Sequence, residues 1–455
     1  METVPAEMLE RIFRLLPHKD LKTVVLVCRR WRQVGEAPRL WAWVVLTVTR
    51  ENISYMPGLL EARRLQAVKE LVLTHIGEDG KLLKAVVKHQ GLKKLEFVCE
   101  NLGDLEQPEQ LWPIVQPSVR LLGQAMSRME VVTVMEPSVL TSWQEQEIFK
   151  AIALGESKLT KLHMDFEENP MSSVEPGMLA RALGKIREVR LPYALLGKVQ
   201  IEKILDSIIE GCKIKILDVE GNILTDLDPQ ILAEAVCKLD AANLNDTDLT
   251  TPQIKTIFTA ISSDENILLK DLNIGENEVQ VKPELLAAAV TKLERLNLNS
   301  SGLSSNQTGA IFSAIQAPGS RLSTLELQHN DLSSVEPGLL ARAVTRLEEV
   351  NFQNAKMTPG QASAILTALC GGHCLKRLRL VGSCLLDEHL KELVASTIQK
   401  LKGVDHDLAN ILNSSGSEDE GGESSEEESD DGDSNEGESG EEEENIIIFY
   451  PFPEA

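Results

Sequence analysis

The stretch LSSVEPGLLARAVTRLEEVNF, Leu332 to Phe352, nearly repeats the stretch MSSVEPGMLARALGKIREVRL, Met171 to Leu191. Self-similarity between distant parts of one chain predicts a repeat array, in which each unit buries its apolar face against its neighbours. The chain has 455 residues, more than a single domain usually needs. That length fits either several domains or one elongated array.

The repeated unit contains the pattern Leu-x-x-Leu-x-Leu, with other apolar residues at some leucine positions. Each unit combines a short β pattern, such as Leu293, Leu296 and Leu298, with a polar turn and a helical pattern such as residues 283–293. When the first leucine is counted as position 1, the register starts are Trp43, Val68, Leu92, Met129, Leu159, Ile186, Ile214, Leu239, Leu269, Leu293, Leu322, Leu347 and Leu375. Proline recurs where helices are expected to begin, because its missing N–H and fixed φ suit the first helical turn. These prolines are Pro176, Pro229, Pro252, Pro283, Pro337 and Pro359.

The array resembles the long, helix-containing leucine-rich repeats seen in ribonuclease inhibitor. The resemblance implies an α/β horseshoe solenoid over residues 43–412, with a parallel sheet inside and helices outside. Repeats before Ile214 depart from the pattern, so their boundaries are less well defined. The prolines within residues 104–120 indicate an inserted loop. A tolerated surface insertion is preferred to a partner-binding loop.

Asparagine occupies the ninth position in alternate repeats, as Asn222, Asn277 and Asn330. A buried asparagine there can bond the backbone where the chain leaves the strand and has spare donors and acceptors. We interpret these three residues as structural.

The N-terminal residues predict three short helices. A Val-Pro pair at residues 4–5 indicates a helix start, and apolar residues follow at helical spacing until Pro17. Asp20 can cap a second helix, and a basic segment, residues 29–32, follows it. Three short helices bury too little surface to be stable alone, and apolar residues on more than one face indicate a partner.

This region, VPAEMLERIFRLLPHKDLKTVVLVCRRWRQVGEAPRLW, resembles an F-box, with Val-Pro, Glu-x-Leu, Ile-Phe, Leu-Pro, Asp-Leu, Val-Cys, Arg-Trp and Leu-Trp all in register. The resemblance implies an all-helical F-box over residues 1–42 that docks on a Skp-type adaptor, which in turn bridges to a cullin. The implied adaptor-binding residues are Pro5, Leu9, Ile12, Leu16, Leu21 and Val27. The alternative is that they form the core of a helical cap on the array, and we prefer this core interpretation for Trp31 and Trp41.

Side chains at the third, fifth and seventh positions of each register are expected to face the concave side of the solenoid. At the fifth position they run from His163 through Arg190 and Asn273 to Arg379, with mixed charge around an amide-rich centre. That composition suits a protein partner better than nucleic acid, which requires a continuous basic stripe. A solvated sheet face is the alternative. The candidate client-binding residues are Arg190, Asp218, Asn243, Asn273, Arg295, Asn297, Glu326, Asn351, Arg377 and Arg379.

The C-terminal residues 413–455 form an acidic tail with an apolar end. From Ser414 onward there are 17 Asp and Glu and no Lys or Arg, so the formal charge of −24 leaves about −7 for the preceding residues. Too few apolar residues are present to offset the ordering entropy, which predicts disorder. Acidic residues three positions on make the tail serines candidates for acidophilic casein-kinase-type phosphorylation. These candidates are Ser417, Ser424, Ser425 and Ser439. A solubilising polyanion is the preferred interpretation of the tail. Its apolar end, residues 446–453, is expected either to cover the open end of the array or to act as a short linear motif.

Seven scattered cysteines and the lack of an apolar N-terminal signal indicate a reducing compartment, the cytoplasm or the nucleus. No apolar run is long enough to cross a bilayer, so no membrane partner is expected.

Chemical motifs are sparse. Cys370, His373 and Cys374, with Cys384 and His389 beyond, fit no zinc spacing, and buried thiols in the last repeat are preferred to a metal site. There is no phosphate-binding Gly-Lys-Ser/Thr loop and no Gly-x-Ser-x-Gly elbow. We therefore expect no catalytic residues, metal or cofactor.

Together the resemblances imply a non-catalytic substrate receptor of an SCF-type ubiquitin ligase. One alternative is an acidic-tailed binding protein or chaperone for basic nuclear proteins. Another is a regulator resembling the GTPase activator for Ran. The F-box is expected only for the first.

Overall fold

The computed structural model describes residues 4–16, 18–74, 80–98, 116–135, 142–165, 171–383, 388–401 and 403–409. The chain divides into two units, Met1–Ser414 and Ser415–Ala455. The predicted acidic tail, its candidate phosphorylation sites and its apolar end lie outside the described residues.

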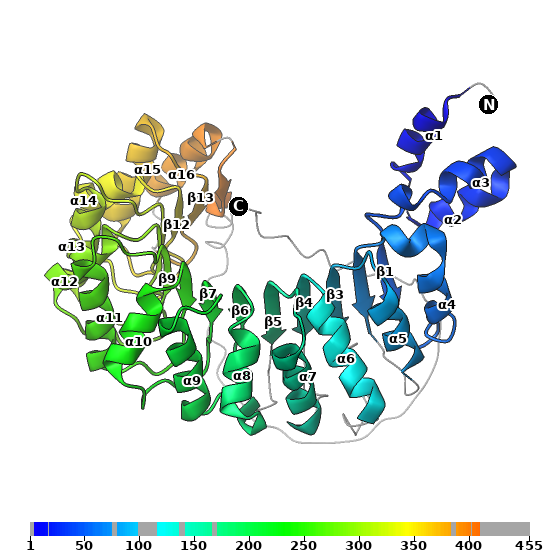
Figure 1. Ribbon diagram of the computed structural model, residues 1–455. Coiled ribbons are helices and arrows are strands. Elements are labelled where there is room, and N and C mark those ends of the chain that lie inside the picture. The colour runs from blue at the N-terminus through cyan, green and yellow to red at the C-terminus, as the bar shows by residue number, and fades with distance from the viewer. Residues whose placement is uncertain are drawn as a thin grey trace, which may run out of the picture. The chain divides into compact units, whose positions relative to one another are not determined.

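A single 14-stranded sheet organises the first unit, and its strands follow the order of the chain (Figure 1). All neighbouring strands pair in parallel. The strands are β1 Val45–Val48, β2 Glu70–Leu73, β3 Lys94–Val98, β4 Val131–Met135, β5 Lys161–Asp165, β6 Glu188–Arg190, β7 Ile216–Asp218, β8 Ala241–Asn243, β9 Asp271–Asn273, β10 Arg295–Asn297, β11 Thr324–Glu326, β12 Glu349–Asn351, β13 Arg377–Arg379 and β14 Asp405–His406. A strand begins two residues after every predicted register start, including those before Ile214. The predicted leucine-rich-repeat solenoid is confirmed.

The last strand, β14, is absent from the sequence-based prediction. Its pairing with β13 aligns Asp405 with Arg377, which places Gly403 at position 1 and His406 at position 4. Two apolar positions of the pattern are therefore occupied by non-leucine residues, and the motif is not visible in the sequence.

Helices cover the outer face of the sheet, and Figure 1 shows them on the convex side of the curved sheet. They are α4 Met56–Glu61, α5 Lys81–Lys88, α6 Gln116–Arg128, α7 Ser142–Leu154, α8 Pro176–Leu183, α9 Lys198–Ile209, α10 Pro229–Cys237, α11 Thr251–Ser263, α12 Pro283–Val290, α13 Ser305–Ile315, α14 Pro337–Val344, α15 Pro359–Gly371 and α16 Glu388–Lys400, with short 3-10 turns η2 Arg63–Ala67 and η4 Met171–Ser173. All six predicted prolines lie in the first turn of a helix. Among the described helices, none is both long and apolar enough to span a bilayer.

The predicted insertion at residues 104–120 needs one correction. Gln116 to Arg120 form the first turns of α6, and Val119 is fully buried. The helix has an apolar face that packs on the neighbouring repeats, so these residues belong to the solenoid. Residues 104–115 lie outside the described part of the chain.

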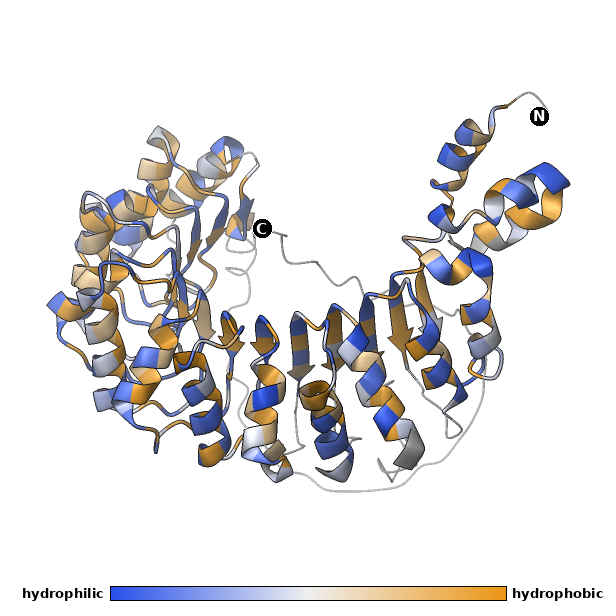
Figure 2. Ribbon diagram, in the orientation of Figure 1, coloured by the Kyte–Doolittle hydropathy of each residue, from blue (hydrophilic) through white to orange (hydrophobic). Residues whose placement is uncertain are grey.

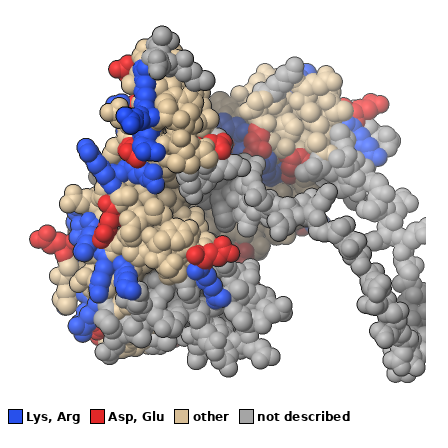
Figure 3. Space-filling view, turned by 90° about the vertical axis from the view of Figure 1, so that its right-hand side faces the viewer, with Lys and Arg blue, Asp and Glu red and all other residues tan. Residues whose placement is uncertain are grey.

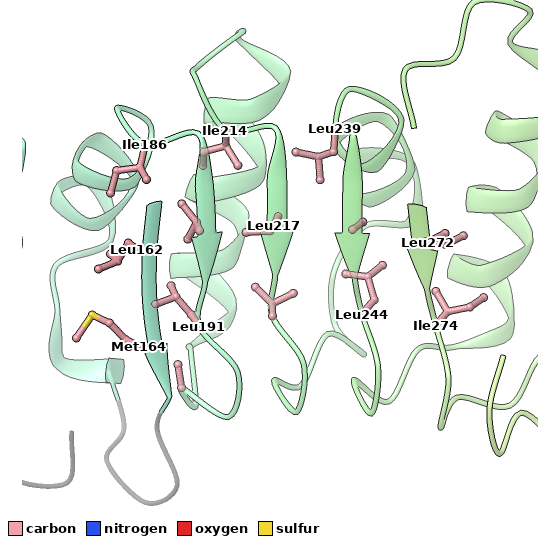
Figure 4. Close-up of a cluster of buried hydrophobic side chains, with 14 of the residues drawn as sticks. Leu162, Met164, Ile186, Leu191, Ile214, Leu217, Leu239, Leu244, Leu272 and Ile274 are labelled. Atoms are coloured by element: carbon pink, nitrogen blue, oxygen red, sulfur yellow. The ribbon is translucent and has the colours of Figure 1, made fainter. Parts of the chain in front are cut away.

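The core lies between the sheet and the helices. In β10, Arg295 is exposed and Asn297 half-buried, whereas Leu296 between them is 1% exposed. Equivalent residues stack from strand to strand, as Leu162, Leu217 and Leu272 do in Figure 4. Figure 2 shows hydrophobic residues on the strands and on the helices packed against them. Burying one leucine row and one helix face per repeat stabilises each unit only through its neighbours.

The ninth-position asparagines satisfy the backbone where each strand ends. Asn222 is fully buried; its Oδ1 accepts from Leu196 N at 2.9 Å, and its Nδ2 donates to Leu191 O and to Val219 O, each at 2.9 Å. Asn277 and Asn330 make the equivalent bonds. Each side chain thereby joins its own turn to that of the preceding repeat, which confirms the structural interpretation.

The turn also requires a left-handed backbone at the eighth position. Gly221 and Gly382 have φ of +68° and +74° there, a region that suits glycine. Other repeats hold side chains in the same conformation, which is rare for non-glycine residues. These residues are Tyr193, Asp246, Glu276, Ser300, His329 and Asn354.

A second ladder, formed by buried glutamines, was not predicted from the sequence. Gln361 in the first turn of α15 donates from Nε2 to Leu332 O and Val335 O, both at 2.6 Å, and accepts from Thr358 N at 2.7 Å. Equivalent glutamines in other repeats are Gln200, Gln253 and Gln307. The Ser/Thr-x-x-Gln capping box was the signal that could have revealed three of them.

Replacing Gln361 with Ala should lower the free energy of unfolding by about 1–3 kcal/mol, because Val335 O loses its donor and Thr358 N loses its acceptor. Urea denaturation of the full chain measures this change. Gln280→Ala is the matched control, since Gln280 is exposed and bonds only to Glu278, and it should change stability by less than about 0.5 kcal/mol. Equal effects of the two substitutions would contradict the proposed role of the ladder.

Candidate functional site

The first of two candidate surfaces is the N-terminal helical region, formed by α1 Ala6–Phe13, α2 His18–Val27, α3 Arg29–Gly35 and η1 Pro38–Leu40. Pro5 precedes α1 as its N-cap, and the Cys28 side chain caps α3 by accepting from Trp31 N at 3.4 Å. Phe13 is fully buried and contacts the Trp31 ring edge-on, with 5.1 Å between ring centroids. Trp41 is 3% exposed, and its Nε1 donates to Gly35 O at 2.8 Å. The core interpretation of the two tryptophans agrees with these contacts.

The structure divides the predicted adaptor-binding set into two groups. Leu9 and Leu21 are 3% and 1% exposed, so in this structure their side chains hold the helices together. Leu16 is half-buried, whereas Pro5, Ile12 and Val27 lie at the surface. The assignment of these residues to adaptor contacts stays a prediction, and the accessible members are its relevant part.

Further apolar side chains on this surface were not selected from the sequence. Met8 is 50% exposed and Leu15 is 85% exposed, and with Ile12 they follow one face of α1 and its C-terminal turn. Leu26 beside Val27 is 73% exposed. The i, i+4, i+7 spacing of the α1 residues was the signal that could have identified them. Such a row of exposed apolar side chains indicates a partner-binding surface.

An apolar cleft of about 840 Å³ adjoins this surface where α2 meets β1 and α4. Leu26, Trp43 and Tyr55 line it, and Trp43 and Tyr55 are each at least half exposed. The Arg64 guanidinium lies 5.3 Å from the Trp41 ring centroid at its margin. The apolar surface of the helices therefore continues onto the first repeat.

Exposed basic side chains lie on the same N-terminal helical region. Figure 3, which views the molecule from this end, shows Lys and Arg gathered along one side. The buried carboxylate of Glu10 binds Arg14 at 2.9 Å and also pairs with Arg39. Arg29 and Arg32 are exposed on α3. The predicted basic segment is therefore at the surface.

The second candidate surface is the concave face of the sheet. The predicted fifth-position residues are successive register partners across the sheet, from His163 and Arg190 through to Asn351 and Arg379. All ten candidate client-binding residues line one of two depressions of about 250 and 200 Å³, which share Thr324 and Glu326. Four further polar residues line the same depressions, at the third and seventh positions that were expected to face the concave side. They are Asp271, Thr324, Glu349 and Gln353.

Most charged groups of this face are partnered within it. The Asp405 carboxylate accepts from Arg379 Nη2 at 2.7 Å and from Arg377 Nε at 3.2 Å, and the bond from Arg379 lowers the pKa of Asp405. Burial raises the pKa of Glu326, which accepts from Asn297 Nδ2 at 3.2 Å. Arg377 and Arg379 are thus held in place, and a client would have to compete with Asp405 for them.

Burial also affects the titration of two further groups on this face. It is the main cause that raises the pKa of Asp218. Burial lowers the pKa of His163, assisted by the neighbouring Arg190. Both shifts disfavour the charged form of the side chain.

No group of three His, Cys, Asp or Glu side chains that could hold a metal was found among the described residues. Cys370 is half-buried with its Sγ 3.6 Å from Thr397 Oγ1. The prediction of buried thiols is wrong for Cys374, which is exposed because the chain after α15 runs over the surface. The side chains of Cys384 and His389 lie outside the described part.

Comparison with known proteins identifies the N-terminal region. Residues 1–47 match the model of the F-box-like family, which confirms the predicted F-box. No curated protein sequence matches the chain. Among solved structures, an internalin (inlF) of Listeria monocytogenes is similar, with 13% identity, a TM-score of 0.41 and coverage of 75% of this chain and 81% of the internalin. The complex of Rad7 and Elc1 in yeast contains a similar chain, with 13% identity, a TM-score of 0.46 and coverage of 81% and 90% respectively.

Proposed function

We propose that this chain is a non-catalytic substrate receptor of a cullin-based, SCF-type ubiquitin ligase. The F-box docks on a Skp-type adaptor, the adaptor bridges to a cullin, and the leucine-rich repeats bind the client protein. The observation that carries the proposal is the F-box-like match over residues 1–47, on a region whose apolar side chains include an exposed row.

The exposed row fits an adaptor interface in its chemistry. Ile12 and Leu15 of the row, with Leu26 of α2, supply apolar area, and exposed basic residues such as Arg29 follow on α3. Interfaces of this kind combine an apolar centre with a polar rim, and the centre supplies most of the binding energy. The chain loses no core packing when these residues bind a partner, because their side chains lie at the surface.

The mechanism requires no chemistry on this chain. Binding of a client to the solenoid and of the adaptor to the F-box turns the encounter between client and ubiquitin-charged enzyme into a local event. A continuous hydrogen-bonded sheet and its asparagine and glutamine ladders set the distance between the two binding surfaces. The site of action would be the cytoplasm or the nucleus.

Co-expression of the full chain with a Skp-type adaptor tests the proposal. We expect a stable complex that elutes as one species in size-exclusion chromatography. An adaptor that elutes alone, beside a folded chain with an unchanged circular dichroism spectrum, would contradict the proposal. Co-purification of histones, or stimulation of GTP hydrolysis by Ran, in place of adaptor binding would favour the two alternatives.

A further inference from the structure

A cluster of hydrogen-bond acceptors lies at the edge of the concave face, where strands β6 to β10 end. It consists of seventh- and eighth-position residues, and we call it the acceptor rim. Its members are Tyr193, Glu220, Asn245, Asp246, Glu276 and Asn299. The rim adjoins the larger concave depression at Asn243, whose Nδ2 donates to Glu220 Oε2 at 2.9 Å.

Two of the three carboxylates of the rim, those of Glu220 and Glu276, are bonded to amides, and none of the three has a cationic partner among the described residues. Glu220 Oε1 accepts from Asn245 Nδ2 at 3.2 Å, and Glu276 Oε1 accepts from Asn299 Nδ2 at 3.2 Å. Neighbouring arginines are engaged elsewhere, Arg190 with Glu188 at 2.9 Å and Arg295 with Asp271 at 3.3 Å. Among the described residues, no Lys or Arg lies within ion-pair distance of Glu220, Asp246 or Glu276.

Two amide oxygens of the rim lack any donor. Asn245 is only 6% exposed, and neither its Oδ1 nor that of Asn299 has a hydrogen-bond partner among the described residues. A Cβ on Gly275, in the turn after the intervening strand β9, would lie 1.6 Å from Asn299 Oδ1 and 2.6 Å from Asn245 Oδ1. The two oxygens therefore lie side by side in the space that glycine leaves, between the amides bonded to Glu220 and Glu276. Buried acceptors are normally paired, so two adjacent unpaired oxygens favour a donor from outside the chain at this point of the rim.

An aromatic ring borders the acceptors. Gly221 leaves room for the Tyr193 ring, since a Cβ there would lie 2.1 Å from Tyr193 Cδ1. Tyr193 is 41% exposed, and its hydroxyl donates to Glu220 Oε1 at 3.4 Å. Burial, with the nearby carboxylates of Glu220, Asp246 and Glu276, raises the pKa of the Tyr193 phenol, which places three negative charges around it. At the tenth positions beside it, Leu195 and Ile223 are 50% and 63% exposed.

We propose that the acceptor rim binds an arginine or lysine side chain of a basic segment of the client protein. The cation supplies the donors that the carboxylates and the two amide oxygens lack. The ring of Tyr193 offers a face for cation–π stacking, and the apolar neighbours receive the methylene stem. This inference rests on the proposed function in taking the partner to be the client.

A metal ion is a poorer fit to the same atoms. A calcium ion needs six to eight converging oxygens, whereas the three carboxylates follow three different strands, and those of Glu220 and Glu276 already accept amide donors. An exposed aromatic ring adds nothing to such a site, but it does add to the binding of a guanidinium.

Binding of a short oligo-arginine peptide to the full chain, followed by fluorescence anisotropy, tests the inference. Glu220→Gln combined with Glu276→Gln should weaken binding about tenfold, because two charge-assisted contacts are lost. The control is Glu265→Gln with Glu284→Gln, which removes the same charge from exposed positions outside the rim and should change binding less than about twofold. The acidic tail is the same in all variants and also binds such a peptide, so the result to compare is the difference in binding between the rim variant and the control pair. Tyr193→Leu, which leaves the charge unchanged, should weaken binding by about threefold.

Three results would overturn the inference. They are unchanged peptide binding in the rim variant, an equal loss in the control pair, or rim-dependent binding of calcium chloride without rim-dependent binding of the peptide. Thermal melting verifies that each variant is folded. Adaptor binding should be the same in all variants, so failure of the adaptor complex would count against the proposed function and not against the rim.

Discussion

Replacing Ile12 and Leu15 with Asp should abolish complex formation with a Skp-type adaptor and leave the chain folded. The two side chains are 47% and 85% exposed, so the fold does not depend on them. In an apolar interface each new carboxylate would be desolvated without a partner, which costs several kcal/mol. We expect affinity to fall at least about a hundredfold, as measured by isothermal titration calorimetry.

A matched control separates this effect from a general effect of added charge. Val199→Asp with Leu268→Asp also places two carboxylates on exposed apolar positions, 56% and 52% exposed, but in later repeats, on α9 and in the loop before β9. This pair should bind the adaptor like the unmodified chain. Leu9→Asp would not be informative, because Leu9 is 3% exposed and its replacement would unfold the F-box. If the Ile12 and Leu15 variant kept its affinity, the docking surface would have to lie elsewhere.

Leu9 is buried and Ile12 is exposed, and the sequence of the F-box alone could not predict this difference. Both fit the family pattern, and spacing alone indicates apolar residues on more than one face of α1. Which face is buried depends on α3 and on Trp31, which contacts Phe13 from a later part of the chain. Only the packed structure could therefore separate core residues from available surface.

The solenoid could be predicted because the spacing of apolar residues within each repeat determines its register. An apolar residue, most often leucine, at the first, fourth and sixth positions fixes which side chains enter the core, so the concave row from Arg190 to Arg379 could be read in order. β14 has His406 and Gly403 where apolar residues are expected, and it was missed although it pairs like the others. Hydrogen bonds to the neighbouring strand β13 can hold residues 405–406 as a strand although their own sequence lacks the apolar pattern.

The ion pairs and side-chain contacts of the concave face could not be predicted from the sequence, for a different reason. Arg377 and Arg379 were selected as client-binding residues, but Asp405, on the unpredicted strand, binds both. The proximity of Asn245 and Asn299 likewise depends on Gly275 from the intervening repeat. These contacts join residues of different repeats, so a sequence pattern within one repeat does not predict them.

A buried carboxyl group in α7 should make the stability of the chain depend on pH. Glu145 is 0% exposed, and both its carboxylate oxygens lack a hydrogen-bond partner among the described residues. Burial raises its pKa from 4.5 to about 8. Between these values the folded chain keeps a proton that the unfolded chain releases. The free energy of unfolding therefore falls as pH rises from about 4.5 to about 8.

Glu145→Gln should remove this dependence, because the amide is similar in shape and does not titrate. Raising the pH from 4.5 to 7 lowers the contribution of Glu145 to the free energy of unfolding by about 3 kcal/mol, because the slope is about 1.4 kcal/mol per pH unit. The difference in free energy of unfolding between variant and unmodified chain should therefore increase by about 3 kcal/mol over this interval. Urea denaturation at several pH values measures it.

Glu147 on the same helix provides the control. It bonds to Lys150, which lowers its pKa, and it also pairs with Arg120. Glu147→Gln should keep the decline of stability between pH 4.5 and pH 8, since Glu145 is still present. Because the amide introduced by Glu145→Gln also lacks partners, the absolute stabilities at one pH decide nothing, and the slopes with pH are the result to compare. Parallel slopes for Glu145→Gln and the unmodified chain would show that Glu145 is ionised in the fold, which its fully buried position argues against.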